Sequence, residues 1–455
     1  MSIIEPRTLK GFRDFLPREM LQRQALMDTA RTVYQSFGFS PIDTPALELQ
    51  EILSGKGSEE TDRQMYRFED NGGRSVGMRF DLTVPLARFV AQHIGQLGTP
   101  FKRYHIAPVW RGENAQRGRY REFIQCDFDT IGTRSIMADI EMILVIDRLL
   151  TKLDFERFQI RINNRKLLNG LLANLDLQAH SVAVLRALDK LSKVGPEAVV
   201  KEMVDLVGVS SQAAQQVLNL CQSSGESDGV LSVAESVVGG NELGREGVSE
   251  LRQVLEATSA AGIPSARIHL DISIARGLDY YTGTIVETML SDLPEIGSIC
   301  SGGRYDNLAS LYTKQDLPGV GASLGLDRLL AAMEELNLVQ QAQSPTQVLI
   351  AYFDPLLQAN YLKFGAILRD AGLNVELYPE PAKLKKQLKY ADQKRIPAVL
   401  LIGSQEIENR QAQVKWMLDN QQDNLPLTED LAAIIQCFTQ KLSGSGADRQ
   451  AVGLQ

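Results

Sequence analysis

The sequence predicts an α+β fold that carries an inserted helical domain and a smaller C-terminal α/β domain. Three observations support this prediction. Strand-like and helical segments are mixed up to residue 175, a purely helical pattern fills 176–262, and strands alternate with helices after 347. A chain of 455 residues is also too long for one ordinary core, so we expect two or three domains.

The first 163 residues contain elements of both kinds, and the two strands within 103–131 are joined by a polar turn. The expected elements are a helix over 11–37, a strand over 39–45, a strand start and an apolar helix within 76–94, strands over 103–111 and 121–131, a helix over 136–153 and a strand over 157–163.

The rest of the chain is expected to hold the insertion and a second core. Strands are expected at 267–273, 283–290 and 296–301, with a helix from about Gly325; after a linker come strands 347–353, 374–379 and 398–403 and helices 355–371, 382–395 and 428–441. The predicted domains are 1–175 with 263–336, the insertion 176–262, a linker 337–346, a C-terminal domain 347–441 and a Gly/Ser-containing flexible tail 442–455.

Composition narrows the class of protein. Hydrophobic residues make up 44% and charged residues 23%, which is typical of a globular chain. The first residues carry charges and prolines, and no apolar run could span a bilayer, so we expect a cytoplasmic protein without a membrane partner. The four cysteines are scattered and the four histidines do not cluster, so no protein metal site is expected.

The net charge of −8 does not exclude a nucleic-acid partner, because binding depends on local basic stretches more than on the total charge. One such stretch is 109–125, which places Arg111, Arg117, Arg119 and Arg121 around a loop between two strands. Guanidinium groups bind phosphate through paired, charge-assisted hydrogen bonds. Residues 111, 119 and 121 share strand parity and are expected to face one cavity. A solvated basic hairpin is the alternative.

Two further segments are rich in polar and glycine residues. Residues 273–283 combine an arginine, an aspartate and two tyrosines, whose hydroxyls can read the edge of a heteroaromatic ligand. A strand-to-turn junction with buried tyrosines explains the same pattern. Residues 302–306 precede the glycine-rich stretch 319–328, where a ligand could approach the backbone closely. That stretch lacks the spacing of a dinucleotide fingerprint or a P-loop.

Together these segments resemble the histidyl-tRNA synthetase family, one of the class II aminoacyl-tRNA synthetases. The resemblance runs from about residue 6 to about 441. Motif 1 matches Gly38–Pro45 with the helix before it, motif 2 matches 111–125, motif 3 matches 321–328, and the two signatures of the histidine enzymes match 276–281 and 302–306. It implies a class II antiparallel sheet with flanking helices, a C-terminal anticodon-binding domain, and a homodimer assembled through motif 1.

The resemblance also implies roles for single residues. For the histidine pocket it implies that Asp81, Thr83 and Gln125 hold the amino group, that Asp129 and Tyr281 read the imidazole, and that Tyr280 and Tyr305 complete the pocket. For ATP it implies that Arg111 binds the α-phosphate and the histidine carboxylate, and that Arg276 binds the α-phosphate from the opposite side. It also implies that Glu113 contacts the adenine, and that Arg119 and Arg328 bind the outer phosphates, with Arg328 also lying over the adenine.

The implied reaction is that of a histidine–tRNA ligase, which activates L-histidine with ATP and transfers it to the 3′ end of its cognate tRNA. The histidine carboxylate attacks the α-phosphorus and pyrophosphate leaves, so catalysis is mostly charge neutralisation and alignment. Arg111 and Arg276 are therefore the expected catalytic residues. The attacking carboxylate is already ionised and needs no general base. Mg²⁺ is expected on the pyrophosphate side, held partly by ATP.

Some residues depart from the commonest pattern of the family. Asp81-Leu82-Thr83 stands where many bacterial relatives have Glu-Gly-Thr and matches another branch. Ala115 stands where many relatives have proline, which leaves recognition of the tRNA acceptor end open. A basic helix for tRNA phosphates is expected from Lys383, Lys385, Lys386, Lys389, Lys394 and Arg395, with a solvated helix face as the alternative.

Two other functions fit parts of the pattern. A non-catalytic paralogue of this family is the histidine-sensing regulatory subunit of ATP phosphoribosyltransferase, but it lacks the C-terminal domain and usually loses the phosphate-binding arginines. Here residues 347–441 and the arginines at 111, 119, 276 and 328 are all present. A ligase for another amino acid would leave Asp129, Tyr281 and the 276–281 signature unexplained.

Overall fold

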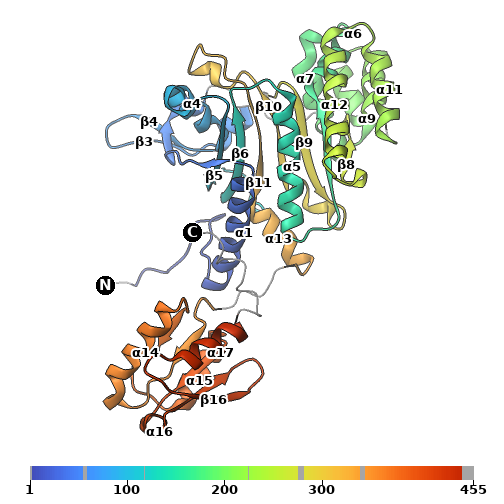
Figure 1. Cartoon of the computed structure of the whole chain (residues 1–455). Coiled ribbons are helices and arrows are strands. Elements are labelled where there is room, and N and C mark those ends of the chain that lie inside the picture. The colour runs from blue at the N-terminus through green and yellow to red at the C-terminus, as the bar shows by residue number, and fades with distance from the viewer. Residues whose placement is uncertain are drawn as a thin grey trace. The chain divides into compact units, whose positions relative to one another are not determined.

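The computed structural model describes residues 3–54, 59–116, 118–223, 225–274, 281–338 and 344–442. The chain divides into two compact units, of which the larger contains Met20–Gln340 and the smaller Gln341–Gln455 (Figure 1). Among the helices that the structure describes, none combines the length and the apolar character needed to cross a membrane.

An eight-stranded sheet forms the centre of the larger unit, in the order β1-β5-β6-β11-β10-β9-β7-β8. Its strands are β1 (Ser40–Pro41), β5 (Phe101–Trp110), β6 (Glu122–Ile131), β7 (Phe158–Asn164), β8 (Ile268–Leu270), β9 (Thr284–Leu290), β10 (Cys300–Tyr305) and β11 (Gly319–Gly325). The six inner strands pair antiparallel, whereas β1 and β8 lie parallel to their neighbours at the two edges. The predicted antiparallel sheet is therefore confirmed.

The two faces of this sheet differ in polarity because side chains alternate along a strand. On one face Ile106, Cys126 and Leu324 lie in one cross-strand row and belong to the main hydrophobic core. The helices α1 (Pro17–Ser36) and α5 (Ile136–Lys152) cover this face, and α5 runs along the sheet in Figure 1. The opposite face carries Arg103 and Asp129, which are paired with each other in the strand register. The candidate site lies on that polar face.

A smaller antiparallel sheet, β2-β4-β3, and further helices complete the larger unit outside the helical insertion. These elements are β2 (Leu47–Leu49), β3 (Arg67–Glu69), β4 (Ser75–Met78), α2 (Gln50–Leu53), α3 (Glu59–Gln64), α4 (Thr83–Leu97), α13 (Leu326–Glu335) and the 3-10 helices Ser265–Arg267, Pro294–Ile296 and Ala309–Leu311. Of these, α4 and α13 begin beside the cavity described below, so their first residues can reach a ligand.

Between β7 and β8 the described chain is helical, and these helices group at one side of the large sheet (Figure 1). They are α6 (Arg165–Asn174), the 3-10 helix Gln178–His180, α7 (Ser181–Leu188), α8 (Leu191–Val194), α9 (Pro196–Asp205), α10 (Ser211–Cys221), α11 (Ser227–Val238) and α12 (Glu242–Ala260). Apolar residues of α6 and α12 join the same hydrophobic core as the sheet. The exact domain boundaries stay a prediction.

The smaller unit has a five-stranded sheet in the order β13-β12-β14-β15-β16 and its own hydrophobic core. Its elements are β12 (Val348–Ile350), the 3-10 helix Pro355–Leu357, α14 (Gln358–Asp370), β13 (Val375–Leu377), α15 (Leu384–Gln393), β14 (Ala398–Leu401), α16 (Ser404–Glu408), β15 (Gln411–Trp416), β16 (Gln422–Pro426) and α17 (Ala432–Leu442). The hairpin of β15 and β16 was not predicted, because glutamine and asparagine replace apolar residues on its outer face.

Several predicted element boundaries were wrong, and a proline and a glycine explain two of them. Helix α1 begins at Pro17 rather than residue 11, since proline has no N–H and suits the first helical position. Strand β1 keeps only Ser40–Pro41 of the expected 39–45. Strand β10 begins at Cys300 rather than 296, after a 3-10 turn that ends at Gly297 with φ of 76°.

Glycines set the distance between α6 and α12. A Cβ atom at Gly247 would lie 2.5 Å from the backbone nitrogen of Leu167, where no side chain can yield. We predict that Gly247→Ala lowers the free energy of unfolding by about 1–3 kcal/mol, despite alanine's better helix propensity. Thermal melting measures this. Gly229→Ala on α11 is the matched control, because its Cβ meets nothing within 4 Å; a control that loses as much stability would contradict the packing explanation.

Candidate functional site

Two adjoining cavities open on the polar face of the large sheet, with volumes of about 250 Å³ and about 210 Å³. The first is lined, among the predicted site residues, by Asp81, Thr83, Arg111, Gln125, Asp129, Tyr281, Tyr305 and Arg328. The second is lined by Arg111, Glu113, Arg119, Gln125 and Arg328. Three of these residues line both cavities, so the two form one site. Arg276 and Tyr280 lie outside the described residues, as does Arg117.

Asp129 forms the deep, acidic end of the first cavity. Its carboxylate accepts a hydrogen bond from the Tyr305 hydroxyl and pairs with Arg103, whose Nη2 lies 2.5 Å from Oδ2. Burial raises the pKa of Asp129, and Arg103 followed by Tyr305 opposes this shift. A hydrogen-bond acceptor is thus held at the bottom of the cavity, where water is scarce.

The glycines of β10 and β11 make room for these side chains. A Cβ atom at Gly321 would lie 2.2 Å from Asp129 Oδ1, and one at Gly319 would lie 2.3 Å from the Tyr305 ring. Gly303 faces Tyr281 in the same way, at 3.1 Å. We expected these glycines to let a ligand approach the backbone. The contacts show that Gly319 and Gly321 leave space for the site's own side chains. Gly302 and Gly321 also line the first cavity, where a ligand could approach the backbone.

The start of α4 supplies a second buried carboxylate. Asp81 Oδ1 accepts hydrogen bonds from the backbone N–H groups of Thr83 and Val84, at 3.1 and 2.9 Å. Burial raises the pKa of Asp81, and these bonds and Arg111 act against it. Opposite, Gln125 Nε2 donates to Ser323 Oγ at 2.7 Å, which fixes the amide in the cavity wall. Carboxylate, amide and hydroxyl groups together suit a ligand ammonium group.

The other end of the site is cationic. Arg111 Nε donates to the carbonyl of Phe80 at 3.1 Å, and its guanidinium lies 4.4 Å from the centre of the Phe80 ring. Arg119 Nη1 is 3.8 Å from Glu113 Oε2, and Arg328 donates to the Ser298 carbonyl. Each of these contacts engages one edge of a guanidinium and orients it in the cavity wall. Planar cations arranged in this way can bind a chain of phosphates.

The prediction that Arg121 shares a cavity with Arg111 and Arg119 was wrong. Arg121 Nε donates to the Glu113 carbonyl at 3.1 Å, and Nη1 reaches the Lys10 carbonyl at 3.4 Å. Its backbone N–H also donates to Gly11. Strand parity failed because the loop before residue 122 is irregular, so Arg121 ties that loop to the N-terminal segment instead.

A buried carboxylate at the start of α13 fixes the neighbourhood of Arg328. Asp327 is contacted by Arg13 and Arg23, each at 2.5 Å, and Oδ2 also accepts from the Ile124 backbone N–H at 3.2 Å. The guanidinium of Arg13 lies 3.2 Å from the centre of the Tyr120 ring. One side chain therefore joins the N-terminal segment, α1, β6 and α13. Sequence reasoning missed it because its partners are about 300 residues away.

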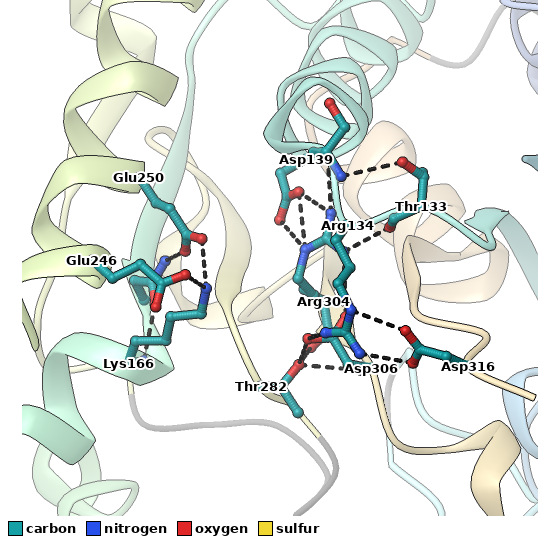
Figure 2. Close-up of polar contacts among 12 residues, drawn as sticks. Thr133, Arg134, Asp139, Lys166, Glu246, Glu250, Thr282, Arg304, Asp306 and Asp316 are labelled. Carbon is teal, nitrogen blue, oxygen red and sulfur yellow. Dashed lines mark hydrogen bonds and ion pairs between the residues drawn. The ribbon is translucent and has the colours of Figure 1, made fainter. Parts of the chain in front are cut away.

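The signature 302–306 divides between two tasks (Figure 2). Tyr305 lines the first cavity, whereas Arg304 does not line it and is almost fully buried. Arg304 Nε donates to both oxygens of Asp139 at 3.1 Å, and its Nη atoms donate to the carbonyls of Thr133 and Ser135 at 3.0 and 3.1 Å. The arginine of this signature thus anchors β10 to the start of α5.

The same network holds the chain next to Tyr281. Thr282 Oγ1 donates to Asp306 Oδ2 at 2.8 Å, and the Thr282 backbone N–H donates to the Arg304 carbonyl at 2.8 Å (Figure 2). Arg134 adds an ion pair to Asp306 at 3.6 Å. Residues flanking both cavity tyrosines are therefore fixed by one cluster of polar contacts.

Sequence reasoning also missed Asp127, which lines the first cavity two residues from Asp129. It is 2% exposed and lies opposite Ser323 in the strand register. Burial raises the pKa of Asp127 to about 7, with Asp129 adding to the shift and Arg103 opposing it. The alternation of polar residues at 125, 127 and 129 was the signal that could have found it. Ser301 and Glu287, from β10 and β9, also line this cavity.

An antiparallel sheet with arginines and buried carboxylates on one face is the architecture of a class II aminoacyl-tRNA synthetase, and comparison with known proteins identifies the family. A family model described as histidyl-tRNA synthetase matches residues 11–329, and one described as an anticodon binding domain matches 347–437. The chain belongs to the histidyl-tRNA synthetase family.

Individual relatives agree over nearly the whole chain. A histidine–tRNA ligase of Rhodopirellula baltica is 56% identical over 94% of this chain and 97% of its own, and one of Wolinella succinogenes is 46% identical over 91% and 95%. The crystal structure of histidyl-tRNA synthetase from Nostoc sp. PCC 7120 superposes with a TM-score of 0.86, at 34% identity, covering 96% of this chain and all of that one.

Asp127 is expected to make the stability of the folded protein depend on pH. Its folded pKa of about 7 lies above the ordinary value of 3.8, so the folded chain holds a proton that the unfolded chain loses. Stability should therefore fall as the pH rises from about 4 to about 7. We predict that Asp127→Asn removes this loss and adds a few kcal/mol of stability at pH 8 but little at pH 4. Urea denaturation of both proteins at the two pH values measures it; an equal effect at both would contradict the assignment.

Proposed function

We propose that this chain activates L-histidine with ATP, forming histidyl-adenylate and pyrophosphate, and then transfers histidine to the 3′ end of its cognate tRNA. The observation that carries this proposal is one continuous site with a buried acidic end, at Asp81 and Asp129, and a cationic end, at Arg111, Arg119 and Arg328. An amino acid bound at the acidic end can react with a nucleoside triphosphate bound at the cationic end only if the two ends adjoin.

At the acidic end the proposal assigns the ammonium group to Asp81, Thr83 and Gln125. Asp129 and Tyr281 then face the imidazole, and Tyr305 holds Asp129 through its hydroxyl. Tyr281 is partly buried, and desolvation raises its pKa and keeps its hydroxyl protonated. An ionised carboxylate that accepts and a phenol that can donate would match the two nitrogens of a neutral imidazole. Tyr280 completes the pocket by resemblance to the family.

At the cationic end Arg111 is proposed to bind the α-phosphate and the histidine carboxylate, because it lines both cavities. Glu113 would accept from the adenine, and Arg119 and Arg328 would bind the outer phosphates. By resemblance, Arg276 approaches the α-phosphate opposite Arg111. Arg111 and Arg276 are thus the proposed catalytic residues. They would neutralise charge as the carboxylate attacks the α-phosphorus and pyrophosphate leaves.

Mg²⁺ enters this proposal with ATP, whose phosphate oxygens are the hard ligands that the ion prefers. Glu287 lines the first cavity and is this chain's candidate carboxylate near the metal. The bound ion would withdraw charge from the leaving pyrophosphate. Among the residues that the structure describes, no group of three His, Cys, Asp or Glu side chains is placed to hold a metal without ATP.

The smaller unit is proposed to bind tRNA through α15. Lys383, Lys385 and Lys389 are exposed and make no ion pair within the described part of the chain. Lys386 and Lys394 pair with Glu380 and Glu376, at 2.7 and 3.1 Å, so they are less available to phosphates than the sequence suggested. Arg395 adds a positive charge at the helix end. The homodimer, the cytoplasmic location and the domain boundaries stay predictions of the sequence.

The regulatory-subunit alternative is less supported. The curated relatives that match nearly the whole chain are histidine–tRNA ligases. The chain also keeps the smaller unit, and Arg111, Arg119 and Arg328 line the site.

The direct test is ATP–pyrophosphate exchange with each amino acid in turn. We predict exchange with histidine alone, because a pocket that hydrogen-bonds its ligand rejects analogues without those groups by roughly 10⁴–10⁵. Exchange of similar size with another amino acid, or none with histidine, would contradict the proposed activity.

A second test separates activation from tRNA binding. We predict that the triple variant Lys383→Ala, Lys385→Ala and Lys389→Ala raises the KM for tRNA about tenfold or more and leaves pyrophosphate exchange unchanged, because phosphate contacts add to affinity without touching the activation site. The effect should shrink at high salt. The matched control is Lys386→Ala with Lys394→Ala, whose ammonium groups are already paired. An unchanged KM in the triple variant would argue that tRNA does not use this helix face.

A further inference from the structure

A buried arginine lies beneath the site without lining it. Arg103 is in the middle of β5, has no exposed surface, and is paired with Asp129 in the strand register. Its Nη2 lies 2.5 Å from Asp129 Oδ2, and this is its one ion pair within the described residues. None of its guanidinium nitrogens has a hydrogen-bond partner there, so the contact with Asp129 is an ion pair only. A fully buried guanidinium with so few partners is costly unless its charge is needed.

The reason for the charge is the number of carboxyl groups nearby. Asp81, Asp127 and Asp129 are all buried around the first cavity, and burial raises the pKa of each. Arg103 opposes the shift at all three, and at Asp127 and Asp129 it is the largest opposing influence. Without Arg103, like charges and low dielectric would favour protonation of these carboxyls.

Other groups that face this cluster do not replace Arg103. From β5, His105 bonds through Nε2 to Asp43 at 2.9 Å, and burial lowers the pKa of His105 to about 4, so the ring is neutral at pH 7. Tyr305 from β10 and Tyr281 donate or accept hydrogen bonds but carry no charge. Arg111 acts on Asp81 at the other end of the cavity.

We propose that Arg103 is a specificity-determining positioning residue, which holds Asp129 ionised and oriented as the acceptor for the imidazole N–H of histidine. This inference rests on the proposed function. Arg103 occupies Oδ2 of Asp129 and the Tyr305 hydroxyl occupies Oδ1, and both contacts favour the carboxylate. Each carboxylate oxygen has a second lone pair, so one remains for the ligand. A ring without an N–H would leave that oxygen unpaired and would be rejected.

A double-mutant cycle tests whether Arg103 acts through Asp129. Asp129→Asn should raise the KM for histidine about 10- to 100-fold, as expected for the loss of a hydrogen bond to a charged group, and change the KM for ATP little. Arg103→Met should do the same. The double variant should be no worse than Asp129→Asn alone, and it removes both buried charges together, which favours folding. Where Arg103→Met is too unstable to purify, Arg103→Gln gives the same cycle with a neutral side chain that can still hydrogen-bond.

A pH profile separates this role from a structural one. Without Arg103 the pKa of Asp129 rises further, so the carboxylate is regained only at higher pH. The KM for histidine in Arg103→Met should therefore fall with rising pH more steeply than in the unchanged protein. Arg267→Met is the matched control, because it removes a partly buried ion pair with Asp147 outside the site; it should lower the melting temperature and leave that profile unchanged.

The outcomes are distinct. Effects of Arg103 and Asp129 that add in the cycle, or a pH profile like that of the control, would overturn the role of Arg103 while leaving the proposed function intact. An unchanged histidine KM in Asp129→Asn would overturn the assignment of Asp129 itself, and with it this inference. Non-additive effects with a steeper profile support it.

Discussion

Charged side chains can occupy the middle of the large sheet only because the strands beside them carry glycines. Gly321 faces Asp129 and Gly319 faces Tyr305 at distances that a Cβ atom could not share. The space left by these glycines is filled by a carboxylate and a phenol rather than by an apolar core. The antiparallel register of β6, β11 and β10 then places the remaining polar residues around the same cavity. Most of the site residues thus come from the strands of the sheet, and loops contribute residues at its edges.

Burying so many polar groups requires compensation nearby. Asp129 has Arg103 and Tyr305, Asp327 has Arg13 and Arg23, and Asp139 has Arg304. Each pair joins segments that are distant in the sequence, so the partners form only when the sheet and its covering helices are assembled. The same contacts that satisfy buried charges therefore fix the positions of Arg328 and Tyr305. Stability and site geometry depend on the same interactions here.

The two ends of the site follow from different backbone contexts. The acidic end is built mainly from strand positions that alternate toward the cavity, together with the start of α4. The cationic end is built from the segment after β5 and the start of α13, where the backbone is irregular or changes direction. Side chains on strands are held more rigidly than those on loops. This difference suits a pocket that must discriminate one amino acid and a neighbouring region that must accommodate a flexible triphosphate.

Periodicity predicted the helical segment and the second α/β unit, because periodicity is a local property. Through its resemblance to the histidyl-tRNA synthetase family, the sequence also predicted the antiparallel sheet and most of the site. It placed ten of the twelve expected site residues where the structure brings them together around two adjoining cavities; Arg276 and Tyr280 lie outside the described residues. Only the tertiary structure decided that Arg121 turns to the N-terminal segment, that Arg304 anchors α5 while its neighbour Tyr305 faces the cavity, and that Arg103 and Asp127 lie beside Asp129. These outcomes depend on cross-strand register and on partners tens to hundreds of residues away, which no local pattern records.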